Sequence, residues 1–532
     1  MGSTFITQHE DGRLERTAEG EEYLASLVTN TKGDIYSFYD AMEPRVVAAA
    51  LARLSQFGGD LRELLLKEFA GQSGEQAALL RRVLTQFGDD AVAQLSYVPV
   101  MVENASHLLS KQLEWGRLAA YLEQSTRNIF YDQKRNGQYR YYTPQQLPKT
   151  LRDEYIRTMD AIFDNYTALV RQMTEWLQSK DGTPEAERDV AWRIAVQHKA
   201  RQIARGLLPI ATTATVGIVG SAQAIDTLIT HLLAEDVSEA KEAGAHILEE
   251  VRKQHAFFFE RTDMPEAGMA TVAYKHRVKQ HIEAVAAKVQ LAKPKPAQIG
   301  ATLLDYSPQD ELALVTHMLF ARTNLSFAEL EQRLAAWSED ELAAALALYM
   351  GERTNRHHKP GRALEVARYT FEIVSDYDAF RELHRHRLVD AIEWQKLTPY
   401  LGYTIPSSIK EAGLEELYTK THALATALYE KLVSQGFSLE AQYATLLDAR
   451  MRWKVTLNAR AAFNLIESRT EPQDTASYRS IAQAMHAEIA KVHPRLAKAM
   501  LFVGRKADDP VIDQQTQLQQ AAAQLKALGI EI

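Results

Sequence analysis

Three arginines and two histidines fall within one short stretch in the second half of the chain: Arg381, His384, Arg385, His386 and Arg387. The Arg-His-Arg run at its end offers several forked, permanently charged donors. Such donors suit a phosphate group or the electron-rich edge of a flavin. The same run also fits the solvated face of a surface helix. These residues are therefore candidates for binding an anion.

A second polar group begins where the β-rich piece 452–457 turns into a helix. It consists of Asn458-Ala459-Arg460, then Arg469 and Arg479. At the start of a helix, a polar side chain and the backbone N–H groups can meet an anion together. An asparagine that caps the helix, followed by surface arginines, accounts for the same pattern. Both interpretations stay open at this point.

A third group lies in the first half and consists of Glu123, Ser125 and Arg127, with Arg205 further along in the segment 204–209. Alternate residues share one face of an extended chain, so the first three could grip a polar ligand together. A polar strand edge or a turn is the simpler alternative.

Composition excludes several classes of protein and site. The chain has no cysteine, so disulfides, Cys-type zinc sites, iron–sulfur clusters and thiolate nucleophiles are ruled out. The net charge of −8 argues against general nucleic-acid binding, which needs a basic surface. There is no apolar run of about 18 residues and no signal-like N-terminus, so we expect a cytoplasmic protein with no membrane partner.

Two short motifs carry no function. Gly217-Ile218-Val219-Gly220-Ser221 lacks the third glycine and the acidic partner of a dinucleotide-binding loop, so we interpret it as close packing. His357-His358 has no second ligand pair at a suitable spacing, and no metal site is predicted.

Apolar periodicity predicts a mostly helical first half with short β-rich pieces at 35–38 and 212–219. The expected helices cover 43–57, 60–69, 75–87, 151–179, 238–258 and 270–291. Lys293-Pro294-Lys295-Pro296 is the clearest linker, because alternating prolines stiffen the chain and block helix continuation.

The pattern restarts after this linker, which indicates an internal repeat. Four pairs of segments correspond in the same order: 35–44 with 303–310, 112–128 with 382–398, 142–144 with 403–406, and 212–224 with 449–461. The sequence therefore predicts one repeat over 1–292, a linker over 293–299, a second repeat over 300–510 and a helical tail over 511–532.

Together these groups resemble the signature of the flavin-dependent thymidylate synthase family, which opens with Arg-His-Arg and ends with Glu or Gln, Ser and Arg-Tyr. Residues 385–387 match the opening, and Glu393 falls at the acidic position. In the first half the opening is Trp115-Gly116-Arg117, whereas the end is kept as Glu123, Ser125 and Arg127. The resemblance covers nearly the whole chain, with the family's pattern present once in each half. It implies two tandem copies of that family's helix-rich α+β fold.

The family's other motifs are divided between the halves in the same way. Its ARxxLP segment matches 204–209, whereas the second half has Gln442 where Arg205 stands in the first. Its Asn-Ala-Arg motif matches 458–460, whereas the first half has Ser221 and Gln223 there. In the family, a homotetramer builds each site from different subunits. The division therefore implies a homodimer of tandem chains, a pseudo-tetramer in which only one set of composite sites is complete.

The resemblance further implies a flavin-linked enzyme that methylates dUMP or a related pyrimidine nucleotide reductively, with FAD, NADPH and methylenetetrahydrofolate. The implied nucleotide-binding residues are Glu123, Ser125, Arg127, Arg205, Arg385 and Arg469. The implied FAD-binding residues are Arg385, His386, Arg387, Asn458 and Arg460. Ser125, near the reacting pyrimidine carbon, and Arg469 are the implied catalytic residues.

Several positions depart from the family pattern. Two histidines before the signature are replaced by Asp89 and Leu95 in the first half and by Pro360 and Val366 in the second. The signature's Ser and Asn are Asp390 and Ile392, and a Gln before the Arg-His-Arg run is Glu382. Two alternatives therefore stay open. One is a nucleotide-binding or regulatory protein that kept the fold without flavin catalysis, and the other is a related flavoenzyme that acts on a different substrate.

Overall fold

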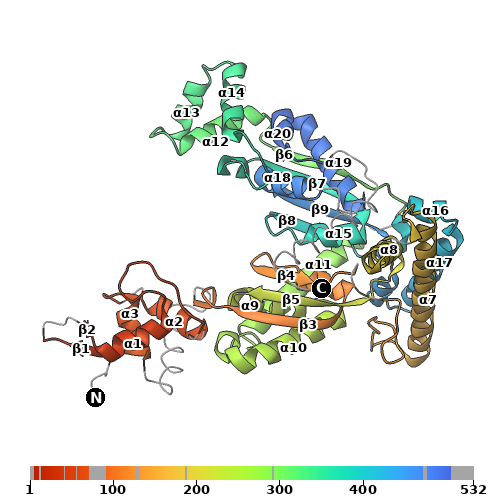
Figure 1. Cartoon of the computed structure of the whole chain (residues 1–532), viewed down its shortest axis with the longest axis horizontal. Helices are drawn as coiled ribbons and strands as arrows, with labels where there is room; N and C mark the ends of the chain where they lie inside the picture. The colour runs from red at the N-terminus through yellow and green to blue at the C-terminus, as the bar shows by residue number, and fades with distance from the viewer. Residues whose placement is uncertain are drawn as a thin grey trace. The chain divides into compact units, whose positions relative to one another are not determined.

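The computed structural model of the chain describes residues 5–10, 14–40, 42, 44–54, 57–70, 92–126, 129, 131–185, 188–289, 293–470 and 476–504 (Figure 1). The expected helix over 75–87, Asp89, Arg127 and the expected tail over 511–532 lie outside these ranges. The chain divides into two compact units. The first contains residues 1–103, 115–123 and 215–290, and the second contains residues 104–114, 124–214 and 291–532.

The first unit combines an N-terminal helical part with a small sheet. The N-terminal part contains β1 (Ile6–Gln8), β2 (Leu14–Arg16), α1 (Ala18–Leu27), α2 (Pro44–Leu54), α3 (Leu61–Leu64) and a π-helical turn over Leu65–Phe69. Asp60 begins α3 with a capping box, in which its side chain and that of Glu63 each bind the other's backbone N–H. Leu24, Leu64 and Phe69 are buried in the core of this part. The expected helices over 43–57 and 60–69 are therefore found, with shorter bounds.

The sheet of the first repeat has the strand order β3-β5-β4, with β3 at Val98–Ser106, β5 at Thr213–Gly220 and β4 at Ala119–Glu123. Strand β5 runs into α9 (Ala222–Leu233), and α10 (Ser238–His255), a 3-10 turn (Ala256–Phe259) and α11 (Gly268–Ala286) follow. The prediction of a β-rich piece at 35–38 is wrong, because only an isolated bridge between Phe38 and Val28 forms there. Accordingly the described residues 35–40 form no strand, whereas 303–310, the proposed counterpart of 35–44, contains most of β6 (Gly300–Ser307).

The second unit is built on a four-stranded sheet with the order β6-β7-β9-β8 (Figure 1). The other three strands are β7 (Arg368–Asp376), β8 (Ala391–Trp394) and β9 (Arg450–Asn458). Neighbouring buried side chains on β7 and β9 lie opposite one another, as in the pairs Phe371 with Val455 and Ile373 with Trp453. This alternation of buried and less buried residues is what a sheet with one covered face requires. Helices α18 (Ala459–Ser468) and α19 (Ala476–Val492) pack beside it.

The remaining helices of the second unit come from both repeats. Those from the first repeat are α6 (His107–Leu113), α7 (Lys149–Lys180), α8 (Val190–Ala204) and a 3-10 turn (Arg205–Leu207). Those from the second repeat are α12 (Leu314–Phe320), α13 (Phe327–Leu334), α14 (Glu339–Met350), α15 (Tyr377–His384), α16 (Ser407–Glu411), α17 (Glu415–Ser434) and α20 (Pro494–Ala499). Short 3-10 turns cover Glu311–Ala313, Arg362–Glu365, Pro399–Leu401 and Glu440–Ala444. The compact units therefore do not coincide with the two sequence repeats.

Equivalent segments of the two repeats pair with each other inside the second unit. Ile210 donates its N–H to the carbonyl of Thr445 at 2.8 Å, and the equivalent bond runs from Leu447 to Leu208 at 2.9 Å. The long helices α7 and α17, which are equivalent in the repeats, also pack together. Gly206 is required at this junction, because a Cβ there would lie 2.7 Å from the hydroxyl of Tyr418. The junction therefore has approximate two-fold symmetry within one chain.

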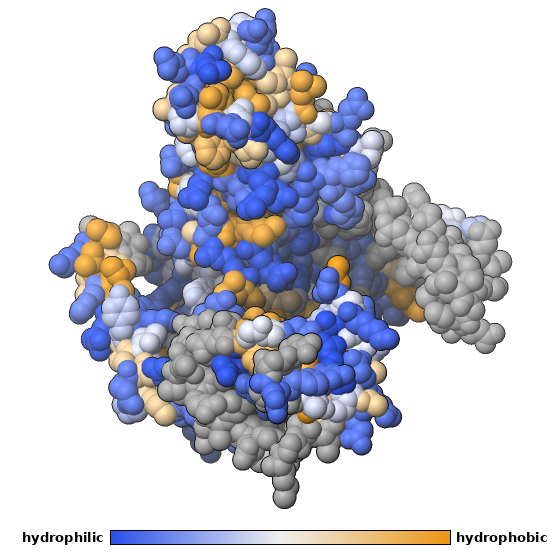
Figure 2. All heavy atoms as spheres, turned by 90° about the vertical axis from the view of Figure 1, so that its left-hand side faces the viewer, coloured by the Kyte–Doolittle hydropathy of each residue, from blue (hydrophilic) through white to orange (hydrophobic). Residues whose placement is uncertain are grey.

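The surface of the described residues carries some apolar side chains. Figure 2 shows apolar residues at its top, where Figure 1 places α12 to α14, and exposed Phe320, Trp337 and Leu348 belong to this region. Among the helices that the structure describes, none combines the length and the apolar character that crossing a membrane requires.

Candidate functional site

Helix α15 positions the Arg-His-Arg run at its C-terminal end. Asp376 caps the start of the helix by accepting the N–H of Ala379 at 2.7 Å, and Arg385 is the C-cap residue. Positive side chains after a helix C-terminus are favoured by the helix dipole. The guanidinium of Arg385 binds the carboxylate of Glu382 one turn earlier, and Arg387 is exposed.

His386 and Arg469 are brought together from two helices. Arg469, the C-cap residue of α18, donates a hydrogen bond from Nε to His386 Nε2 at 2.9 Å. Its Nη1 also lies 4.0 Å from the carboxylate of Glu382. Burial, together with the charges of Arg469 and Arg385, lowers the pKa of His386 to about 3. His386 is therefore neutral. We refer to Glu382, Arg385, His386 and Arg469 as the arginine cluster.

Asn458 and Arg460 lie at the start of α18. The Oδ1 of Asn458 accepts the N–H of Ala461 at 2.9 Å, and Ser221 caps α9 in the equivalent way through Ala224. The interpretation of Asn458 as a helix cap is therefore correct. Arg460 donates from Nε to the carbonyl of Pro360 at 2.9 Å and from Nη1 to Glu365 at 3.2 Å.

The first-half candidates occupy different environments. Glu123 is the last residue of β4 in the first unit and is buried, whereas Ser125 is exposed in the second unit, two residues past the strand. Glu123 and Ser125 therefore do not share one face of a strand, because β4 ends at Glu123. Arg205 begins a 3-10 turn directly after α8, and its guanidinium forms an ion pair with Asp378 of α15. Arg205 is only 4% exposed.

Arg205 and Asp378 meet three other buried polar residues, which are His107, Thr126 and Arg381. We call these five residues the junction cluster. Arg381 Nη1 lies 3.0 Å from His107 Nδ1, and its Nη2 donates to the hydroxyl of Thr126 at 3.2 Å. The same Nη2 lies 3.6 Å from the second carboxylate oxygen of Asp378. Arg381 was visible in the sequence as part of the basic run. Asp378, His107 and Thr126 gave no signal, because their partners lie far along the chain.

The equivalent positions on the other side of the two-fold lack these ion pairs. Gln442 stands where Arg205 does, and it accepts the N–H of Leu397 at 3.0 Å and donates to the carbonyl of Leu439 at 3.2 Å. Lys111 stands where Arg381 does, and its ammonium lies 5.2 Å from the ring centroid of Trp394 and 5.5 Å from that of Tyr377. Trp115, equivalent to Arg385, stacks on His231 at 4.2 Å between centroids.

A partly buried carboxylate, that of Asp376, lies beside the junction cluster. Asp376 accepts a hydrogen bond from the hydroxyl of Ser477 in addition to its helix cap. Burial and the nearby charge of Asp378 raise the pKa of Asp376 to about 7. The carboxyl group therefore holds its proton over most of the acidic range.

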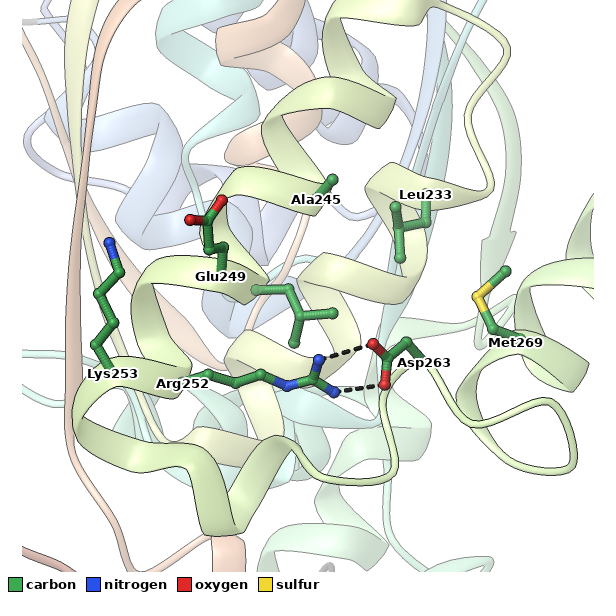
Figure 3. A pocket seen from close by; sticks show the side chains of 8 residues that line it. Leu233, Ala245, Glu249, Arg252, Lys253, Asp263 and Met269 are labelled. Atoms are coloured by element: carbon green, nitrogen blue, oxygen red, sulfur yellow. Dashed lines mark hydrogen bonds and ion pairs between the residues drawn. The ribbon is translucent and has the colours of Figure 1, made fainter.

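One pocket of about 610 Å³ lies in the first unit (Figure 3). Leu233 and Leu248 line it together with Arg252, which binds the carboxylate of Asp263 through two hydrogen bonds of 2.7 and 2.5 Å. None of the candidate residues lines this pocket, so it gives them no support. Within the described ranges no three His, Asp or Glu side chains gather as a metal site needs.

Comparison with known proteins assigns the fold. The family model described as "Thymidylate synthase complementing protein" matches twice, over residues 37–255 and 302–495. A UPF0159 protein of Chlamydia pneumoniae is 30% identical over 92% of this chain and 95% of that protein. One from Thermoplasma acidophilum is 27% identical over 84% of this chain and 92% of that protein.

Two further likenesses cover less of the chain. A flavin-dependent thymidylate synthase of Saccharolobus solfataricus is 32% identical over 25% of this chain and 54% of that protein. A structure of a UMP/dUMP methylase from Streptomyces cacaoi with 5-Br dUMP bound is 18% identical, covers 41% of this chain and 100% of that one, and has a TM-score of 0.32, too low to carry an argument.

The two family matches together span more than half of the chain and fall on either side of the linker, in the order of the predicted repeats. The helix-rich α+β fold and the repeated passage from strand to capped helix agree with them. The chain belongs to the thymidylate synthase complementing protein family, that of the flavin-dependent thymidylate synthases, as a tandem duplication of its domain with diverged halves.

Proposed function

We propose that this chain is a flavin-linked enzyme that acts on a pyrimidine nucleotide at a composite site, with reductive methylation of dUMP as the reference reaction. The observation that carries the proposal is the ion pair between Arg205 and Asp378. It joins the ARxxLP segment of the first repeat to α15, whose end holds Arg385 and His386 about 10 Å further along the helix. The two motif sets that the sequence divides between the halves thus come from neighbouring elements.

In this proposal, arginines supply the recognition of the nucleotide phosphate. Arg385 and Arg469 flank the neutral His386, so the arginine cluster has two permanent positive charges and one carboxylate, from Glu382. Guanidinium groups bind phosphate oxygens through paired, charge-assisted hydrogen bonds. Arg127 and Arg205 complete the implied nucleotide contacts, and Ser125 would orient the pyrimidine ring near its reacting carbon.

In this proposal, the donors around α18 hold the flavin ring. Asn458 uses its Oδ1 for the helix cap, which directs its amide nitrogen elsewhere, and Arg460 is held in place through Nε and Nη1. Side chains oriented by such supporting bonds are suited to hold the polar edge of a flavin. FAD, when bound, would carry hydride from NADPH toward the nucleotide, with methylenetetrahydrofolate as carbon donor. The chain's own part would be to orient the reactants and neutralise their charge.

A second candidate function is nucleotide binding or regulation without flavin catalysis. It is favoured by carboxylates where the family has neutral groups. Glu382 binds Arg385, and Asp390 lies 3.5 Å from Arg368. Carboxylates at these positions disfavour FAD, whose diphosphate is anionic, because like charges repel.

Absorption spectroscopy and calorimetry on the purified chain test both functions. The first function predicts a flavin spectrum, at one FAD per chain after reconstitution, and binding of dUMP. Binding of dUMP by colourless protein that takes up no FAD would favour the second function. Absence of dUMP binding would exclude both.

A further inference from the structure

We infer that Asp378 and Arg381 are positioning residues of the composite nucleotide site, which align the contributions of the two repeats; this inference rests on the proposed function. Both residues lie on α15, one to two turns before Arg385. Neither belongs to the motifs that identify the family in this chain.

Each residue reaches back to a different segment of the first repeat. Asp378 fixes the guanidinium of Arg205, and Arg381 binds His107 of α6 and the hydroxyl of Thr126. Thr126 directly follows Ser125, so the forked side chain of Arg381 sets the position of that segment relative to α15. Arg381 Nη2 also lies 3.6 Å from Oδ1 of Asp378, which links the contacts of Asp378 with those of Arg381.

The contacts are suited to hold geometry because they are buried. Arg205 and Arg381 are each 4% exposed, and His107 and Thr126 are almost inaccessible. A charged hydrogen bond is stronger and more directional where water is excluded, and an unpaired partner left behind is costly. A site whose supporting side chains are fixed in this way keeps its arginines in place for a ligand.

The asymmetry of the duplication separates this role from general stability. The equivalents of Asp378, Arg381 and Arg205 are Leu108, Lys111 and Gln442. Lys111 rests against aromatic rings, and Gln442 binds backbone groups of its own repeat. The two ion pairs of Asp378 therefore have no counterpart on the other side, because Leu108 and Gln442 carry no charge. The side that has them is the side on which Arg205 binds α15, the helix that ends at the Arg-His-Arg run.

The chain itself supplies the test substitutions. Asp378→Leu and Arg205→Gln install the residues that stand at the equivalent positions of the other repeat, and Arg381→Lys replaces the forked donor by a single ammonium. The matched control is Glu311→Leu, which removes a buried carboxylate that binds Arg495 elsewhere in the same unit. Calorimetric titration with dUMP and the melting temperature are measured for each full-length variant.

We expect Asp378→Leu and Arg381→Lys each to weaken dUMP binding about tenfold or more. The double variant Arg205→Gln/Asp378→Leu should bind as weakly as Arg205→Gln alone, because Asp378 acts through Arg205. Glu311→Leu should lower the melting temperature and leave dUMP affinity unchanged. Should Asp378→Leu fail to fold, Asp378→Asn keeps the shape, removes the charge and gives the same comparison.

The inference is overturned if the Asp378 and Arg381 variants behave like Glu311→Leu, with lower melting temperatures and wild-type affinity for dUMP. That result leaves the proposed function intact, because the wild type still binds. Failure of the wild-type chain to bind dUMP would instead remove the proposed function and this inference with it.

Discussion

Arg469 donates from Nε to Nε2 of His386, so the histidine of the Arg-His-Arg run accepts a hydrogen bond from an arginine. This relationship requires Nε2 to be unprotonated, which agrees with the lowered pKa of His386. Burial, together with the two neighbouring guanidinium groups, thus keeps the imidazole neutral.

The stability of the chain should therefore fall with acidity through His386. In the folded state its pKa is about 3, whereas an unfolded histidine titrates near 6.5. Below about pH 6.5 only the unfolded chain takes up this proton, which lowers the free energy of unfolding by about 1.4 kcal/mol for each further pH unit. His386→Gln keeps an acceptor and does not titrate. Melting temperatures from pH 7 to 5 should fall less steeply in this variant than in the wild type, and equal slopes would contradict the assignment.

Asp376 should have the opposite effect on stability, because it stabilises the folded chain in acid. Its folded pKa is about 7, raised above the usual aspartate value of 3.8 by burial and by the charge of Asp378, so folding favours the protonated form. The associated stability is present in acid and is lost as the pH rises from about 4 to 7. Asp376→Asn should match the wild type near pH 4 and be more stable at pH 8, by a few kcal/mol at roughly 1.4 kcal/mol per unit of pKa difference. A variant less stable than the wild type at pH 8 would show that the ionised carboxylate is needed.

The composite site predicts unequal effects at equivalent positions. Arg205→Ala and Arg385→Ala should each weaken dUMP binding, by up to about a hundredfold, because a charge-assisted contact with the phosphate is lost. The double variant should lose less than the sum, since both groups serve one ligand. Gln442→Ala and Trp115→Ala are the matched controls and should leave the affinity nearly unchanged in calorimetry. Equal effects at all four positions would show that the division of motifs has no functional meaning.

Flavin binding should depend on Arg387. This side chain follows α15 and is exposed, so Arg387→Ala changes the protein interior little. Loss of a charged donor should weaken the binding of FAD by about 1.5–3 kcal/mol. Fluorescence titration with FAD measures the effect, and Arg368→Ala, at an exposed arginine next to Asp390, serves as the control. Unchanged FAD affinity in Arg387→Ala would assign the run another role.

The assembly should be a symmetric dimer. If the four-body packing of the family is kept, a single tandem chain leaves apolar faces that normally mark interfaces. Light scattering should then give about 120 kDa, twice the chain mass of 59.9 kDa. A monomer at micromolar concentration would rule out the pseudo-tetramer.

The sequence by itself determined the duplication and the positions of several helices, such as α7 and α10, and it offered a helix cap as one of two roles for Asn458. These are local properties, because helix periodicity, capping residues and the passage from strand to helix depend on neighbours a few positions away. The expectation of a strand at 35–38 failed for the same reason, since local β propensity does not supply a partner strand.

Only the tertiary structure decided what surrounds the candidate residues. Arg205 and Asp378 are 173 positions apart in the chain, and Arg381 and His107 are 274 apart. No periodicity connects residues at such separations, so their pairing depends on how the two repeats meet. The neutral state of His386 likewise follows from burial and from Arg469 on another helix, which the Arg-His-Arg motif alone does not specify.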